Sequence, residues 1–95
     1  MSAFIISRFK ILDPERMLEY SSRAVPMAQS YGGSYLVKSE AVEALDGSYD
    51  GRKLVIMHFP DMARFREFWN SPEYQELRKI RLEATEGDVW LIPSE

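Results

Sequence analysis

Three predicted strands, at residues 3–10, 53–59 and 88–93, are apolar on both of the faces that a strand presents. Successive side chains point to opposite faces of a sheet, so a sheet wetted on one side alternates apolar with polar residues. In the first of these strands Phe4 and Ile6 lie opposite Ile5 and Phe9, in the second Leu54 and Ile56 lie opposite Val55, Met57 and Phe59, and in the third Trp90 and Ile92 lie opposite Val89 and Leu91. Helices can cover only one face, and a second copy of the same sheet is the simplest cover for the other. The sequence therefore predicts a homodimer joined sheet to sheet.

Two helices between the strands are marked by an N-terminal cap followed by proline. Asp13 and Ser71 can each accept hydrogen bonds from free helical N–H groups, and the proline after each suits the first helical position. We expect the first helix to end at the glycine pair 32–33. We also expect it to kink near Ser22 or to divide in two, because Pro26 removes one hydrogen bond.

The second half of the chain predicts two further helical segments. Asp61 caps a short helix that ends at the break formed by residues 70–72. The next helix covers residues 72–85, and Gly87 ends it, since a left-handed residue after a helix is most favourable as glycine.

A strand at residues 34–38, which we expect to resume over residues 41–45, precedes a turn at residues 46–51. The spacing of the turn resembles the start of a calcium loop, but Met57 stands where the twelfth, acidic ligand belongs, so we predict a hairpin and no metal site. The resulting order is β-α-β-β-α(α)-β. We predict one α+β domain over residues 1–95 with the ferredoxin-like fold, a four-stranded antiparallel sheet with helices on one face.

Charge and composition exclude several classes of function. The net charge of −3 leaves no basic footprint for nucleic acid. No apolar run approaches the roughly 20 residues of a membrane span. The N-terminal segment has neither a basic leader nor a cleavage signal, so we expect a cytoplasmic protein. The absence of cysteine excludes disulfides, thiol catalysis and thiolate metal sites.

The helix that follows Ser71 carries a polar stripe beside an apolar one. Tyr74, Arg78 and Arg81 share one face, at spacings of four and three residues. Two guanidinium groups beside a phenol can hold a carboxylate or a phosphate through charge-assisted hydrogen bonds. The stripe therefore predicts an anion site at the edge of the core.

From this stripe we predict a pocket between sheet and helices for a small anionic, partly apolar molecule. The predicted ligand-binding residues are Tyr31, Ser71, Tyr74, Arg78 and Arg81, with Tyr20 in the pocket wall. The alternative is a solvated charged face, in which Glu73, Glu76 and Glu83 pair with the basic residues.

His58 is the single histidine and the candidate catalytic residue. Its ordinary pKa would let it transfer a proton near neutral pH. It lies on the strand face that carries Leu54 and Ile56, so a half-buried histidine at the dimer seam is the alternative. No Ser-His-Asp order, phosphate-binding glycine loop or set of metal ligands accompanies it, and we predict neither a metal nor a cofactor.

Three motifs are similar to those of one known family. They are Tyr-Gly-Gly-x-Tyr-Leu-Val-Lys at residues 31–38, Leu-Val-Ile-x-x-Phe-Pro at residues 54–60, and Trp-Asn-Ser-Pro-Glu-Tyr-Gln at residues 69–75, followed by Arg78 and Arg81. On these motifs the whole chain resembles the family of domain of unknown function 1330, within the dimeric α/β-barrel superfamily. The resemblance implies a ferredoxin-like fold and a dimer whose two sheets close into a barrel.

The wider superfamily includes cofactor-independent monooxygenases, lactone isomerases and haem-degrading enzymes. The resemblance thus implies a cofactor-independent enzyme of isomerase or monooxygenase type as one interpretation, and a non-catalytic dimeric binding or interaction module as the other. Relatives often carry an acidic residue at the position of His58. Haem is not expected, because haem-degrading members use a helical histidine, whereas His58 is predicted on a strand.

Overall fold

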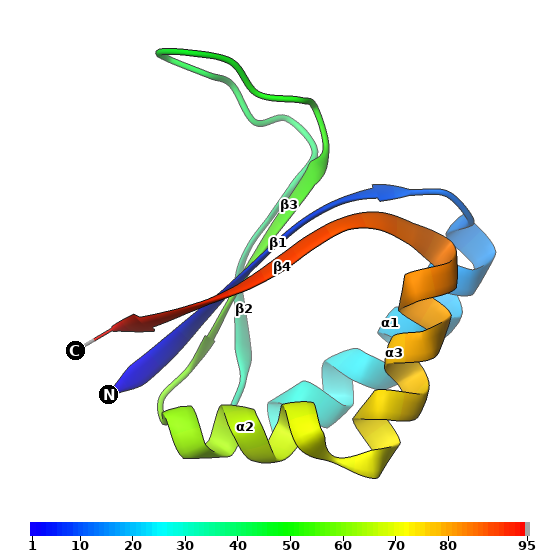
Figure 1. Cartoon of the computed structure of the whole chain (residues 1–95), viewed down its shortest axis with the longest axis vertical. Coiled ribbons are helices and arrows are strands. Elements are labelled where there is room, and N and C mark those ends of the chain that lie inside the picture. Colours follow the sequence, from blue (N-terminus) through cyan, green and yellow to red (C-terminus); the bar gives the residue numbers. More distant parts are fainter. Residues whose placement is uncertain (95) are drawn as a thin grey trace.

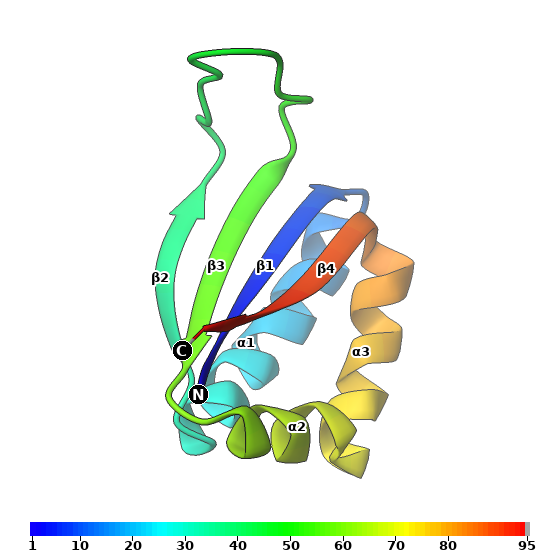
Figure 2. The same cartoon turned by 60° about the vertical axis from the view of Figure 1, so that its left-hand side comes forward.

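The computed structural model describes residues 1–94, which form one sheet and three helices. The elements are β1 (Ser2–Ile11), α1 (Pro14–Ser30), β2 (Ser34–Ser39), β3 (Lys53–Phe59), α2 (Met62–Asn70), α3 (Pro72–Ala84) and β4 (Thr85–Ser94). The four strands pair antiparallel in the spatial order β2-β3-β1-β4. All three helices lie on one side of the sheet (Figures 1 and 2). The predicted ferredoxin-like α+β fold is confirmed.

The helix starts follow the capping motifs of the sequence. The Asp13 carboxylate accepts a hydrogen bond from the Arg16 backbone N–H (3.1 Å), and the Ser71 hydroxyl accepts one from the Tyr74 N–H (3.2 Å). Each cap precedes a proline at the start of its helix, where a missing N–H removes no hydrogen bond. The Ser71 hydroxyl also donates to the Phe68 carbonyl (2.8 Å), so the turn between α2 and α3 is fixed from both sides.

Of the two alternatives expected for the first helix, the division is wrong, because α1 is one element with Pro26 inside it, and the kink near Ser22 stays a prediction. A proline inside a helix removes one backbone hydrogen bond. Ala24 and Ala28, on either side of the proline, are 2% and 1% exposed and pack into the core. Burial of this face outweighs the loss of one hydrogen bond.

The expected strand at residues 41–45 is also wrong, because β2 ends at Ser39 and residues 40–52 form a loop that projects beyond the sheet (Figure 1). Ser39 pairs with Leu54, one residue after the start of β3, so no strand lies opposite the loop to pair with it. An ion pair between Arg8 and Asp50 (2.8 Å) anchors the end of the loop to the sheet.

Gly87 lies within β4 and not at the end of a helix, which corrects the expected boundary. The helix α3 ends at Ala84, and β4 begins at Thr85. Gly87 pairs with Phe9 of β1 at such close range that an added Cβ would meet the Arg8 carbonyl oxygen and lie 2.7 Å from the Phe9 Cα. The glycine therefore serves the close approach of two strands.

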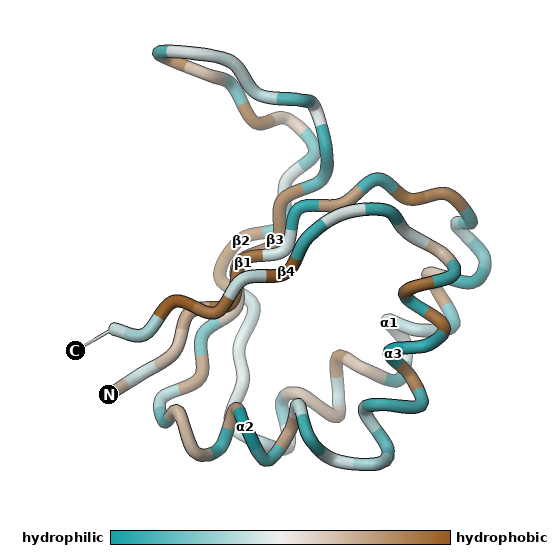
Figure 3. The backbone as a smooth tube through the Cα atoms, viewed as in Figure 1, coloured by the Kyte–Doolittle hydropathy of each residue, from teal (hydrophilic) through white to brown (hydrophobic). Residues whose placement is uncertain are grey.

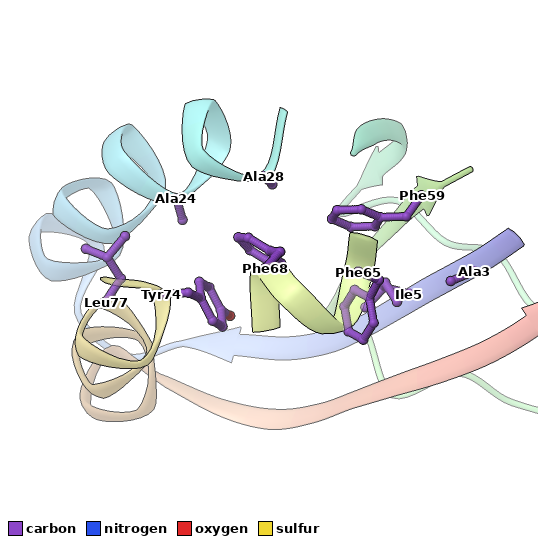
Figure 4. Close-up of a cluster of buried hydrophobic side chains, with 9 residues drawn as sticks. All are labelled: Ala3, Ile5, Ala24, Ala28, Phe59, Phe65, Phe68, Tyr74 and Leu77. Atoms are coloured by element: carbon purple, nitrogen blue, oxygen red, sulfur yellow. The ribbon is translucent and has the colours of Figure 1, made fainter. Parts of the chain in front are cut away.

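The sheet face toward the helices, here the inner face, carries the core. Ile5 and Phe59 are buried on it. Figure 4 shows Phe68 and Tyr74 projecting into the space between α1 and the sheet, and their ring centroids are 4.4 Å apart. None of the helices in residues 1–94 combines the length and the apolarity needed to cross a membrane.

The opposite sheet face, here the outer face, has no helix over it within residues 1–94. It carries Phe4, Ile6, Leu54, Ile56, His58, Trp90 and Ile92. Ile6 lies between Ile56 of β3 and Trp90 of β4, so apolar side chains follow one another across the strands. Trp90 and Ile92 are 47% and 43% exposed. Both sheet faces thus carry apolar rows, as the alternation predicts. Figure 3 shows hydrophobic (brown) residues recurring along the strands between more polar ones.

Candidate functional site

A cavity of about 180 Å³ lies between the inner face of the sheet and the helices. Most of its wall is apolar and includes Ile5, Phe9, Met17, Ala24, Val55, Met57, Phe65 and Phe68. The polar side chains that reach it are Ser7, Tyr20, Ser21, Tyr35, Lys38, Lys53, Tyr74 and Arg81. An apolar enclosure with a few convergent polar groups is the usual form of a small-molecule site.

Three phenols reach this cavity from three different elements. Tyr20 of α1 and Tyr74 of α3 place their hydroxyl oxygens 3.0 Å apart, within hydrogen-bond distance. Tyr74 is 3% exposed and packs against Phe68, which fixes its ring. Tyr35 of β2 lines the cavity from the sheet side. The fold thus brings together hydroxyl groups that lie far apart in the sequence.

Burial raises the pKa of two of these phenols, because a low-dielectric surrounding disfavours the charged phenolate. For Tyr20, desolvation is the largest cause and the neighbouring Tyr74 adds to it, whereas the Arg81 guanidinium lowers the pKa. For Tyr35, burial followed by the influence of Tyr74 raises the pKa to about 12. Both hydroxyls therefore stay protonated at neutral pH and can donate hydrogen bonds.

Cationic side chains at the cavity lack a carboxylate partner. The Arg81 guanidinium carbon is 6.0 Å from the centroid of the Tyr20 ring, and the Lys38 ammonium nitrogen is 4.3 Å from that of Tyr35. The ion pairs formed within residues 1–94 include neither of these cations, nor Lys53. No acidic residue of that part of the chain lines the cavity. The site is therefore positively charged, which favours an anion.

Two of the three carboxylates expected to pair with basic residues in the solvated alternative form ion pairs, and neither pair involves Arg78 or Arg81. Glu76 pairs with Lys79 (3.0 Å) in solvent, and Glu83 pairs with Arg16 of α1 (2.6 Å). Arg81 instead lines the cavity.

Of the six predicted site residues, the structure brings Tyr74 and Arg81 to the cavity, together with Tyr20. Ser71 lies at the start of α3, where its hydroxyl is engaged by the backbone on both sides of the turn. Tyr31, at the end of α1, packs against the Phe68 ring with centroids 5.9 Å apart.

Arg78 and His58 lie away from the cavity. The Arg78 guanidinium carbon is 5.4 Å from the Trp69 ring centroid, and its Nε is buried with no hydrogen-bond partner. The His58 ring lies on the outer face, with its centroid 5.0 Å from that of Phe4. The sheet thus lies between His58 and the cavity.

Five polar residues of the cavity were not among the predicted site residues: Ser7, Ser21, Tyr35, Lys38 and Lys53. Lys53 had a detectable signal, because it begins an alternating row of otherwise apolar side chains on the inner face of β3, with Val55 next in that row. For β2, the register shifts between Tyr35 and Val37, which places both Tyr35 and Lys38 on the inner face. Strict alternation would put them on opposite faces, and a bulge of this kind leaves no clear trace in the sequence.

Residues 2–94 match the family model described as domain of unknown function DUF1330. The chain belongs to this family. The family resemblance stated from the sequence motifs is confirmed for nearly the whole chain. Among curated proteins, none matches the chain significantly.

Solved structures of low sequence identity share the ferredoxin-like fold of this DUF1330 chain. A protein of unknown function from Rhodopseudomonas palustris has a TM-score of 0.74 and 22% identity, over 99% of this chain and 83% of that one. SnoaB, a cofactor-independent oxygenase from Streptomyces nogalater, has a TM-score of 0.69 and 14% identity, over 99% and 93%. A dimeric ferredoxin-like protein of unknown function from Thermobifida fusca has a TM-score of 0.65 and 15% identity, over 99% and 92%. These identities establish the fold, and a fold does not imply a function.

Proposed function

We propose that this protein binds a small, partly apolar anion in the cavity between sheet and helices. The observation that carries the proposal is the lining itself: Arg81, Lys38 and Lys53 reach a mostly apolar cavity to which no acidic residue of residues 1–94 contributes. A cation that lacks a carboxylate partner in a partly desolvated site gains free energy by pairing with an anion. The Tyr20–Tyr74 pair beside Arg81 adds hydrogen-bonding groups that orient the ligand.

The size of the cavity limits the ligand. A cavity of roughly 150 Å³ can hold one benzene ring, and the cavity here measures about 180 Å³. The apolar wall, which includes Phe65 and Phe68, suits the body of the ligand. The expected ligand is therefore a single ring or a short chain that carries one charged group.

We further propose that the functional unit is a homodimer formed through the outer faces of two sheets. The exposed apolar row that contains Trp90 and Ile92 supports this arrangement, and a structural neighbour is described as dimeric. In a twofold interface the same surface of each protomer meets its counterpart, and a contiguous apolar patch on a sheet can pack against a copy of itself. His58, beside Phe4 on this face, would then lie at the seam and serve packing between protomers.

Turnover of the ligand would make this a cofactor-independent enzyme of isomerase or monooxygenase type. The donors around the cavity support such a role, because they can stabilise negative charge that develops on a bound oxygen. Retention of an unchanged ligand would instead make the protein a dimeric binding module. Incubation with a bound ligand, followed by quantification of that ligand, separates the two.

Isothermal titration calorimetry with benzoate and with the neutral analogue benzamide tests anion binding. We expect benzoate to bind and benzamide to bind about tenfold more weakly or worse, because it lacks the charge. Arg81→Met should weaken benzoate binding by about tenfold or more. The matched control is Lys79→Met on the same helix, which removes one positive charge from a solvent-exposed pair with Glu76 and should leave binding unchanged.

Two results would contradict the proposal. One is the failure of benzoate and of a panel of short carboxylates to bind the wild-type protein. The other is an Arg81→Met variant that binds benzoate as tightly as the wild type.

A further inference from the structure

The three phenols of the cavity carry three O–H donors, and within residues 1–94 one of these donors is used. Tyr20 and Tyr74 share one hydrogen bond, in which one hydroxyl donates and the other accepts. A phenol carries a single proton, so the hydroxyl that accepts keeps its own proton for another partner. The Tyr35 hydroxyl donates to no group within residues 1–94, although it reaches the same cavity. Two phenolic protons are thus left for a bound molecule.

These two hydroxyls are strong hydrogen-bond donors, and no carboxylate or amide side chain of residues 1–94 lines the cavity to accept from them. A hydroxyl that accepts one hydrogen bond becomes a better donor for the next, because hydrogen-bonded chains polarise one another. Burial raises the pKa of Tyr20 and of Tyr35, so both hydroxyls stay protonated. The side-chain acceptors that do line the cavity include the neutral Ser7 and Ser21 hydroxyls. A negatively charged ligand oxygen is a stronger acceptor than a neutral hydroxyl, so these donors favour an anionic ligand.

The donors come from opposite walls, and a cation lies beside each one. Tyr35 belongs to the sheet wall and has the Lys38 ammonium over its ring, whereas the Tyr20–Tyr74 pair belongs to the helical wall and has the Arg81 guanidinium beside it. Tyr74 influences the pKa of Tyr35 across the cavity, so the two walls act on the same space. Donors and cations that surround one point stabilise an oxygen atom on which negative charge is concentrated.

We propose that the cavity takes up the ionised form of a small acidic phenol or enol, whose oxyanion accepts hydrogen bonds from Tyr35 and from the Tyr20–Tyr74 pair. This inference names the ligand class of the proposed function and rests on it. The ligand gives its proton to solvent, and no other bond forms or breaks. A carboxylic acid is already ionised at neutral pH, whereas a weak acid becomes more ionised when a site prefers its anion. That difference makes the inference testable apart from anion binding.

The test is a spectrophotometric titration of 4-nitrophenol, whose ionised form absorbs visible light and whose single ring matches the size of the cavity. With the protein in excess, the pKa of bound 4-nitrophenol should lie below that of the free compound by about one pH unit or more, because nearby cations and hydrogen bonds favour the anion. Tyr35→Phe and Tyr74→Phe each remove one hydroxyl and keep the ring, and each should reverse part of this shift. Tyr49→Phe is the matched control, since that hydroxyl donates to the Arg52 carbonyl in the loop (2.9 Å).

Each outcome decides the inference. If 4-nitrophenol binds with an unchanged or raised pKa, or fails to bind while benzoate binds, the inference is overturned and anion binding stands. A lowered pKa that persists in both Tyr35→Phe and Tyr74→Phe also overturns it, because the phenols would then not be the donors. If neither probe binds, the proposed function falls as well. Tyr35 is only half-buried, so Tyr35→Phe keeps the test decisive if loss of the deeply buried Tyr74 hydroxyl impairs folding.

Discussion

The hydroxyl groups of Tyr20 and Tyr74 lie 3.0 Å apart and link α1 to α3 within the wall of the cavity. At the solvent-exposed side of the same two helices, Arg16 pairs with Glu83 (2.6 Å). An exposed ion pair adds little to stability, whereas an unpaired buried hydroxyl costs the full free energy of its desolvation. The phenol pair is therefore the more important polar link between these helices.

Removal of one hydroxyl of this pair should lower stability by more than the value of the shared hydrogen bond, because the other hydroxyl stays buried. Tyr20→Phe leaves the Tyr74 hydroxyl buried without a partner, and we expect the free energy of unfolding to fall by about 1–3 kcal/mol. The double variant Tyr20→Phe/Tyr74→Phe removes both polar groups, so it should lose less than the sum of the two single losses. Urea unfolding of the four proteins measures this, and strictly additive losses would contradict it.

The protein should lose stability above about pH 10. An unfolded chain releases its phenolic protons near pH 10, whereas burial raises the pKa of Tyr35 to about 12 and that of Tyr20 as well. The folded state then holds more protons than the unfolded state, so the stability that these two tyrosines contribute is fully present below pH 10 and is lost as the pH rises from there towards 12. Denaturation midpoints across this range test the sign, and Tyr35→Phe should flatten the decline. A stability that rises with pH in this range would refute the assignment.

Ile92→Lys should convert the proposed homodimer into folded monomers. Ile92 is 43% exposed in one protomer, so a lysine there is tolerated in the monomer, but its ammonium group would be buried between two sheets in the dimer. Sedimentation equilibrium measures the mass, and circular dichroism reports the retained fold. Leu18→Lys, at a 69% exposed position on α1, is the control and should stay dimeric. A wild-type protein that sediments as a monomer at micromolar concentration would exclude the dimer.

The fold was largely predictable because the helix caps and the alternation within strands are local features of the sequence. Asp13 and Ser71 each precede a proline, and both start a helix as predicted. Strand alternation identified β1, β3 and β4 together with their two apolar faces. The errors arose where tertiary contacts decide the outcome. Pro26 is kept within α1 by core packing. Gly87 is required because the backbone of β1 lies too close for a side chain, and the sequence does not show that approach.

The candidate site was less predictable because it depends on distances between elements. Helical spacing grouped Tyr74, Arg78 and Arg81 on one stripe, yet the cavity is reached only by the first and the last of them. Arg78 lies toward Trp69 instead, since the α2–α3 turn places that ring beside it. Spacing on one helix cannot show which neighbour each side chain will meet. The contribution of β2 depends on a shift of register that only the paired strand reveals.

That shift of register in β2 has a consequence for both surfaces of the sheet. Without it, alternation from Tyr35 would turn Lys38 to the outer face and Val37 to the inner face. With it, Val37 lies opposite Ile56 among the apolar side chains of the outer face, and Lys38 lies opposite Val55 and reaches the cavity. One extra residue in an edge strand thus keeps a charge out of the surface proposed for self-association and delivers it to the surface proposed for the ligand. A change in the length of this one strand would therefore alter the proposed dimer surface and the proposed ligand site together.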